Sequence, residues 1–174
     1  MADRFDLKFV NNCSVILETM RDACGSVTNP PIDPAIFSMI ETALNNMDPI
    51  SMIKYYANET HKYWDKIKER DESFICSNVD LILNSVNIDP GMRNIVLSII
   101  NNEKMSKVIS IIKAADEKLR KTHPNEETSL DYIWRAMEGM VKLSIKYTVN
   151  ERTKNPNSVP GATYNLAVMS SKWL

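Results

Sequence analysis

Asp89-Pro90-Gly91-Met92-Arg93-Asn94-Ile95-Val96 begins with an Asp-Pro pair and continues as an apolar run with helical spacing. The pairs Asp33-Pro34 and Asp48-Pro49 precede two similar runs. An Asp side chain at such a position accepts hydrogen bonds from the free N–H groups of a first helical turn. Proline suits the first helical position because its φ is already helical and its missing N–H would have no partner there. The sequence therefore predicts where three helices begin.

Apolar residues at steps of three and four extend this pattern along most of the chain. We expect helices over residues 3–24, 34–47, 49–70, 78–86, 90–100, 103–121 and 129–148. The run from Met92 to Ile100 is apolar on most of its circumference, which predicts a place in the middle of a bundle. No pair of alternating segments joined by a hairpin turn occurs before residue 150. The sequence predicts an all-α fold, with a single bundle of six to seven helices over residues 1–148.

Residues 149–174 have a different pattern. Turn-forming residues at 155–158 and 160–161 end the last expected helix. Apolar side chains then alternate with smaller or polar ones, and they are Tyr164, Leu166, Val168 and, next to the end, Trp173. We expect an extended C-terminal arm that lies in a groove of its own domain, docks on a partner or is disordered.

Composition excludes several classes of protein. The 174 residues suit one domain, and 44% hydrophobic with 25% charged residues is ordinary for a globular chain. The net charge of −1 does not point to a polyanionic partner, and the four glycines are too scattered for a phosphate-binding loop. No signal pattern and no apolar stretch of about 18 residues occurs. We therefore expect no secretion and no membrane span.

Cysteine and histidine residues give no pattern of a metal or cofactor site. Cys13 and Cys24 stand 11 residues apart on one expected helix, about 16 Å, which is beyond the reach of a disulfide. Both fall on its apolar face, which favours a core position. No Cys-x-x-Cys occurs, and His61 and His123 lack partners at ligand spacing. We expect no bound metal and no cofactor.

No arrangement of residues predicts catalysis. His61 has Asp65 one turn later on a charged helix face, which is typical of a solvated or structural histidine. The acidic pairs Asp116-Glu117 and Glu126-Glu127 stand in charged stretches without apolar neighbours. We interpret them as solvated or first-turn charges and expect that the protein is not an enzyme.

One stretch suggests a relationship. Residues 63–74, Tyr-Trp-Asp-Lys-Ile-Lys-Glu-Arg-Asp-Glu-Ser-Phe, resemble a segment of small helical proteins from large eukaryotic DNA viruses. Residues 132–143, with Tyr132-Ile133-Trp134 at the start, are similar to a later helix of the same proteins. The resemblance covers about residues 49–148 and departs at Ile75, where a second Phe is commoner. It implies a viral origin and no assigned activity.

The same stretch also has a structural interpretation. Arg70 suits the C-terminus of a helix, where a cation is favoured. Asp71 is suited to cap the next turn, and Phe74 and Trp64 would anchor that turn on the core. The sequence thus favours a structural role for this motif over a binding role.

We expect a non-catalytic viral protein that acts through protein–protein contacts, as a virion structural or assembly component or as an adaptor. It would work in the virion or in the host cytoplasm or nucleus, with other viral proteins among its partners. Adaptable apolar and aromatic side chains favour this hypothesis. The candidate partner-binding residues are Tyr164, Leu166, Val168, Trp173, Tyr55 and Tyr63.

Two alternatives stay open. The basic helix 103–121 and the tail would suit nucleic acid, because phosphate binding depends on clustered cations. The candidate contacts on that helix are Lys104, Lys107, Lys118 and Lys121. A helical inhibitor of a host pathway, with an apolar groove for an amphipathic helix, is the other alternative.

Overall fold

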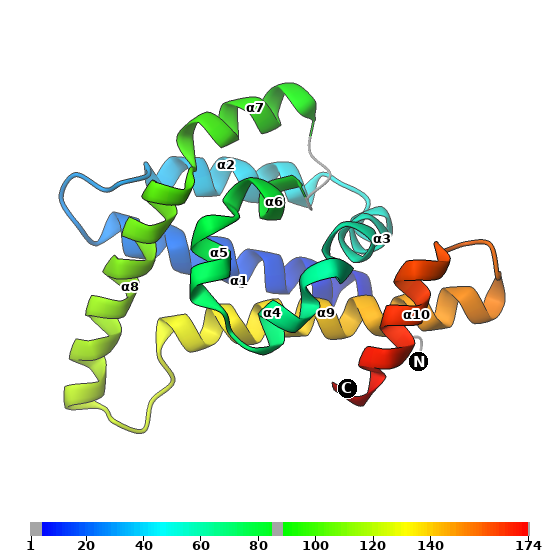
Figure 1. The fold of residues 1–174 in the computed structure, drawn as a ribbon. Coiled ribbons are helices and arrows are strands. Elements are labelled where there is room, and N and C mark those ends of the chain that lie inside the picture. Colours follow the sequence, from blue (N-terminus) through cyan, green and yellow to red (C-terminus); the bar gives the residue numbers. More distant parts are fainter. Residues whose placement is uncertain (1–4, 85–88, 174) are drawn as a thin grey trace.

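The computed structural model describes residues 5–84 and 89–173, in which helices are joined by turns and loops and no strand occurs (Figure 1). The α-helices are α1 (Phe5–Gly25), α2 (Pro34–Asn45), α3 (Pro49–Thr60), α4 (Trp64–Lys68), α5 (Glu72–Ser77), α6 (Val79–Asn84), α7 (Pro90–Ile99), α8 (Asn102–Thr122), α9 (Ser129–Lys154) and α10 (Gly161–Ser170). Two 3₁₀ helices are η1 (His61–Tyr63) and η2 (Ser171–Trp173). The all-α prediction is confirmed. The expected start at Asp3 and end at Val86 lie outside the described residues.

The three Asp-Pro pairs begin helices as predicted. Asp33, Asp48 and Asp89 are the N-caps of α2, α3 and α7, and a proline follows each. Their carboxylates accept hydrogen bonds from backbone N–H groups of the first turn at 2.9 to 3.2 Å. The three helix starts could be predicted because each cap residue directly precedes its helix in the sequence.

The long helices α1 and α9 lie side by side and form the axis of the fold, and α2 and α3 also pack on α1 (Figure 1). Phe9 of α1 is 1% exposed and meets the ring of Tyr56 edge to face, with the centroids 5.2 Å apart. α8 crosses one end of this layer and buries Val108 and Ile112 against it. The main core therefore lies between α1, α2, α3, α8 and α9.

The helix expected over 49–70 is broken. α3 ends at Thr60, and η1 separates it from α4. The Thr60 hydroxyl donates to the Tyr56 carbonyl at 2.7 Å and accepts from Trp64 Nε1 at 2.8 Å. Such back-bonding bends helices, and here the bend turns Tyr63 and Trp64 inward together. Tyr63 is 5% exposed, so little of its side chain is accessible to a partner, and its role in partner binding stays a prediction.

The apolar helix α7 does not lie in the middle of the bundle. It stands at the outer edge of the fold beside α6 (Figure 1). Within α7 only Val96 is buried, and Ile95 is 57% exposed. The predicted central position is therefore wrong. An apolar composition does not show how many other helices pack against a helix.

The C-terminal tail is helical and packs on its own chain. α9 continues through residue 148 to Lys154, and α10 lies against it instead of forming an extended arm. Thr163 and Ala167, one turn apart, are 1% and 0% exposed and form the buried side of α10. The alternation of apolar residues at 164, 166 and 168 was therefore misleading, since the burial follows the helical period.

An anchor at the start of the tail explains this docking. Arg152 of α9 donates from Nη1 to the Val159 carbonyl at 3.0 Å and lies over the ring of Tyr164, 4.8 Å from its centroid. The Thr163 hydroxyl donates to Asn58 Oδ1 of α3 at 3.2 Å. The tail thereby completes a second apolar cluster that includes Trp64, Val141 and Ala167.

Enlarging Ala167 should destabilise the fold. Ala167 is fully buried against α9, so Ala167→Leu forces extra volume into a packed contact and should cost about 1–3 kcal/mol. Its near neighbour Met169 is 74% exposed, and Met169→Leu should change stability by less than about 0.5 kcal/mol. Urea unfolding followed by circular dichroism measures both. Equal effects of the two substitutions would show that α10 does not dock in this way.

No helix within residues 5–84 and 89–173 combines the length and apolarity that crossing a membrane requires.

Candidate functional site

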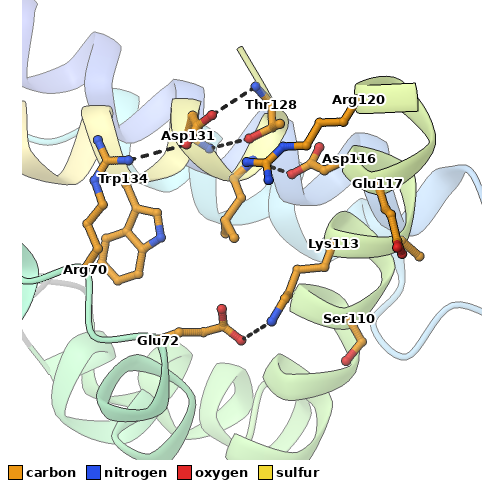
Figure 2. Close-up of a pocket in the computed structure, with 12 residues that line it drawn as sticks. Arg70, Glu72, Ser110, Lys113, Asp116, Glu117, Arg120, Thr128, Asp131 and Trp134 are labelled. Atoms are coloured by element: carbon orange, nitrogen blue, oxygen red, sulfur yellow. Dashed lines mark hydrogen bonds and ion pairs between the residues drawn. The ribbon is translucent and has the colours of Figure 1, made fainter. Parts of the chain in front are cut away.

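A polar cleft of about 720 Å³ opens between the turn that follows α4, the C-terminal half of α8 and the start of α9 (Figure 2). Three cationic and four acidic side chains line it, together with Ser110, Ala114, Thr128, Leu130 and Trp134. The cations are Arg70, Lys113 and Arg120, and the acids are Glu72, Asp116, Glu117 and Asp131. The cleft thus offers charges of both signs within one recess.

The start of α9 forms one wall through a capping box. Thr128 Oγ1 accepts from the Asp131 N–H, and Asp131 Oδ2 accepts from the Thr128 N–H, both at 3.2 Å. The hydrogen bond from the Thr128 side chain is the main cause of a lowered pKa of Asp131, and the charges of Arg70 and Arg120 lower it further. Asp131 is therefore a fixed carboxylate in the cleft.

Asp116 supplies a second cap to the same helix from α8. Its carboxylate is 7% exposed and accepts from the backbone N–H groups of Ser129 at 2.9 Å and Leu130 at 3.0 Å. The interpretation of Asp116 as a solvated charge is therefore wrong. A negative charge buried at a helix N-terminus is stabilised by the free N–H groups and by the helix dipole.

Arg70 stands in the turn between α4 and α5. The Asp71 N–H donates to the Lys66 carbonyl and the Arg70 N–H to the Ile67 carbonyl, both at 3.0 Å, which is the Schellman ending of a helix. Asp71 then caps α5 by accepting from the Phe74 N–H at 3.0 Å. The structural interpretation of this motif is confirmed for Asp71, and Arg70 ends the helix as expected.

The Schellman position of Arg70 normally carries glycine, because it requires the left-handed region. Arg70 has φ of 52° there. Its guanidinium reaches α9, where Nε donates to Glu138 Oε1 at 2.9 Å and Nη1 to Asp131 Oδ1 at 3.4 Å. Two carboxylates, of which Figure 2 shows that of Asp131, thus hold an arginine in an unfavourable backbone conformation at the edge of the cleft.

Replacing Arg70 should separate its backbone strain from its ion pairs. Arg70→Ala loses both pairs and keeps the strain, whereas Arg70→Gly loses the pairs and relieves the strain. We expect Arg70→Gly to be more stable than Arg70→Ala by about 1 kcal/mol, since a non-glycine residue in the left-handed region costs about 1–2 kcal/mol. Chemical denaturation measures the difference. An alanine variant as stable as the glycine variant would contradict this.

The opposite edge of the cleft is an ion pair between α5 and α8. Lys113 Nζ lies 3.1 Å from Glu72 Oε1, and the two side chains are 54% and 38% exposed (Figure 2). Such an exposed pair contributes little to stability, about 0–1 kcal/mol, and it leaves both charges accessible to a partner.

The histidines and cysteines lie outside this cleft. His61 Nδ1 is 2.7 Å from the Asn58 carbonyl, and His123 Nδ1 is 2.9 Å from Thr122 Oγ1. Burial raises the pKa of the Cys13 thiol to about 12, so this thiol is not a nucleophile at neutral pH. Among the residues that the structure describes, no group of three or more His, Cys, Asp or Glu side chains could hold a metal ion.

The residues predicted to bind a partner do not gather in the cleft. Tyr164 and Leu166 are half-buried on α10, and Tyr55 is half-buried on α3. Val168 is 47% exposed, beside the more exposed Met169, which sequence reasoning missed. Trp173 belongs to η2, and its side chain lies outside the described part of the chain.

The four candidate lysines for nucleic acid share one side of α8. Helical geometry places Lys104, Lys107, Lys118 and Lys121 within an arc of about 100°. Lys107 Nζ is 3.0 Å from Glu103 Oε1, and Lys104 is half-buried. Lys118 and Lys121 are exposed, and none of the four lines the cleft.

Comparison of the chain with protein-family models, with curated proteins and with solved structures found no match of any kind. The resemblance of residues 63–74 to helical proteins of large DNA viruses stays a prediction.

Proposed function

We propose that this protein is non-catalytic and acts through protein–protein contacts, with the polar cleft as its contact surface. The observation that carries the proposal is the mixed set of charges in the cleft. Arg70, Asp116 and Lys113 are already held in place by hydrogen bonds or ion pairs within the chain. Charges that are already positioned lose little conformational freedom when a partner binds, and charges of both signs select a complementary partner.

A role as a virion structural or assembly component, or as an adaptor within a virus–host complex, follows from the resemblance described above. Residues 63–74 include Arg70 and Glu72, which stand on two edges of the cleft. The resembling segment and the proposed contact surface thus overlap at these two residues, which supports a shared role.

Nucleic-acid binding is the second candidate. The lysines on one side of α8 favour it, because cations along one helix face can follow a phosphate backbone. The cleft itself does not favour it, since its four acidic side chains would repel phosphates. The test is binding to a 20-base-pair DNA duplex. An affinity that falls as the salt concentration rises, and that is lost in the double variant Lys118→Glu with Lys121→Glu, would support this candidate.

A helical inhibitor of a host pathway has less support. An amphipathic helix docks several side chains, one turn apart, into a long apolar groove. The apolar hollow among the described residues measures about 160 Å³, which is close to the size of one benzene-sized ligand.

Site-specific photo-cross-linking tests where a partner binds. A benzophenone amino acid placed at Ser110, in the cleft, should capture the partner in cells that contain it. The same amino acid at Thr42, on the exposed side of α2, is the control and should capture much less. Equal capture at both positions would contradict the proposal.

A swap of charges tests whether the captured partner uses the cleft. Glu72→Lys combined with Lys113→Glu keeps the internal ion pair and inverts the charges offered to a partner. We expect the affinity of the purified partner, measured by calorimetry, to fall at least tenfold. The matched control is Glu103→Lys with Lys107→Glu, a pair of α8 outside the cleft. Unchanged affinity in the first variant, or equal loss in both, would rule out the cleft.

A further inference from the structure

A second hollow, of about 160 Å³ and partly open to the surface, lies between α1, α2, α6, α8 and α9. Its walls include four methionines, Met20, Met105, Met137 and Met140, and two residues of α1, Cys13 and Leu17. No polar atom of the lining is exposed to it. The cavity is separate from the polar cleft, because no residue lines both.

Only apolar atoms of the lining are exposed to the hollow, and six of the sixteen lining residues are half-buried, so one side of it is open. Leaving it empty costs dispersion contacts on every wall. Water in the hollow would find no hydrogen-bond partner on its walls, and an enclosed apolar cavity of similar volume, about 150 Å³, binds benzene or xenon. The unbranched methionine side chains can adjust to the shape of an apolar guest.

We propose that this cavity is a binding site for one small, uncharged, apolar molecule of about the size of benzene. The volume sets the size of the ligand, and the lining sets its chemistry. A carboxylate or a hydroxyl group would lose its water and gain no partner. The Cys13 thiol offers only a weak donor and stays protonated, so it supplies no charge to the site.

Methionine methyl resonances can detect the ligand directly. In protein labelled with ¹³C at the methionine methyl groups, saturating benzene should shift the signals of Met20, Met105, Met137 and Met140. The exposed Met39 and Met169 serve as internal controls and should not shift. Phenol should bind at least tenfold more weakly than benzene, because its hydroxyl group would be buried without a partner.

A variant that fills the cavity adds a second test. Leu17→Phe places extra volume in the cavity and should abolish the shifts caused by benzene. Leu143→Phe is the matched control, because Leu143 is a half-buried leucine that packs on the same core but does not line the cavity, and this variant should keep the shifts. The titration of the wild-type protein with benzene tests the proposal even if a variant fails to fold. No shift at saturating benzene, or equal shifts at Met39 and Met169, would overturn the proposal without affecting the proposed role of the polar cleft.

Discussion

The Trp64→Ala substitution should lower the free energy of unfolding by about 3–5 kcal/mol, the largest loss that we expect from a single change. The Trp64 side chain is 2% exposed and lies at the centre of the cluster that joins α4, α9 and α10. Its removal leaves a cavity in the cluster that includes Val141 and Ile145, and the Thr60 hydroxyl loses the Nε1–H donor at 2.8 Å. Urea unfolding followed by circular dichroism measures the change.

Two further variants make this test specific. Trp64→Phe keeps an aromatic ring in the cluster and should lose roughly half as much stability as the alanine variant. Tyr132→Ala removes an aromatic ring that is 43% exposed and should cost less than about 1 kcal/mol. A loss at Trp64 no larger than the loss at Tyr132 would mean that the second cluster does not hold the C-terminal helix.

The Asp116→Ala substitution should cost about 3 kcal/mol, because two hydrogen bonds to a charged acceptor are lost and their donors are left at the start of α9. Asp116→Asn keeps one acceptor oxygen and should cost about half as much. Hydrogen exchange should quicken at Ser129 and Leu130 in both variants. Chemical denaturation measures the stability.

Glu117→Ala is the control for this prediction. Glu117 is the next residue of α8 and also lines the cleft, but its side chain is exposed and makes no hydrogen bond to α9. Its removal should change stability by less than about 0.5 kcal/mol. Equal losses at positions 116 and 117 would show that the carboxylate of Asp116 does not cap α9.

Features that depend on near neighbours in sequence could be predicted. The caps at Asp33, Asp48 and Asp89 and the boundaries of α8 depend on residues within one turn. The cap at Asp71 belongs to the same class. The capping box of Thr128 and Asp131 also has a sequence signal, a Thr and an acid three residues apart.

Features that depend on contacts between distant segments could not be predicted from the sequence. The bend after Thr60 buries Tyr63 against Phe74, with the ring centroids 5.4 Å apart, and the packing of α4 on α9 and of η1 on α10 stabilises it. The alternation at residues 164, 166 and 168 fits a strand and predicts an extended tail, whereas the contact of α10 with α9 favours burial at the helical period. Asp116 caps α9 only because the turn at 123–128 brings α8 back to it.

The mixed-charge cleft follows from the same long-range contacts. Arg70, Lys113 and Asp131 come from three separate segments, and no spacing in the sequence links them. The sequence therefore predicts a contact surface of aromatic and tail residues, whereas the contact surface that we propose consists of charged residues that support the ends of helices.

Hydrogen–deuterium exchange with and without the captured partner tests the central claim most directly. If the partner binds the polar cleft, exchange should slow at residues 69–74, 110–120 and 128–135, which surround it, and should not change in α10. Slower exchange confined to α10 around Val168 and Met169, with the residues around the cleft unchanged, would contradict the account.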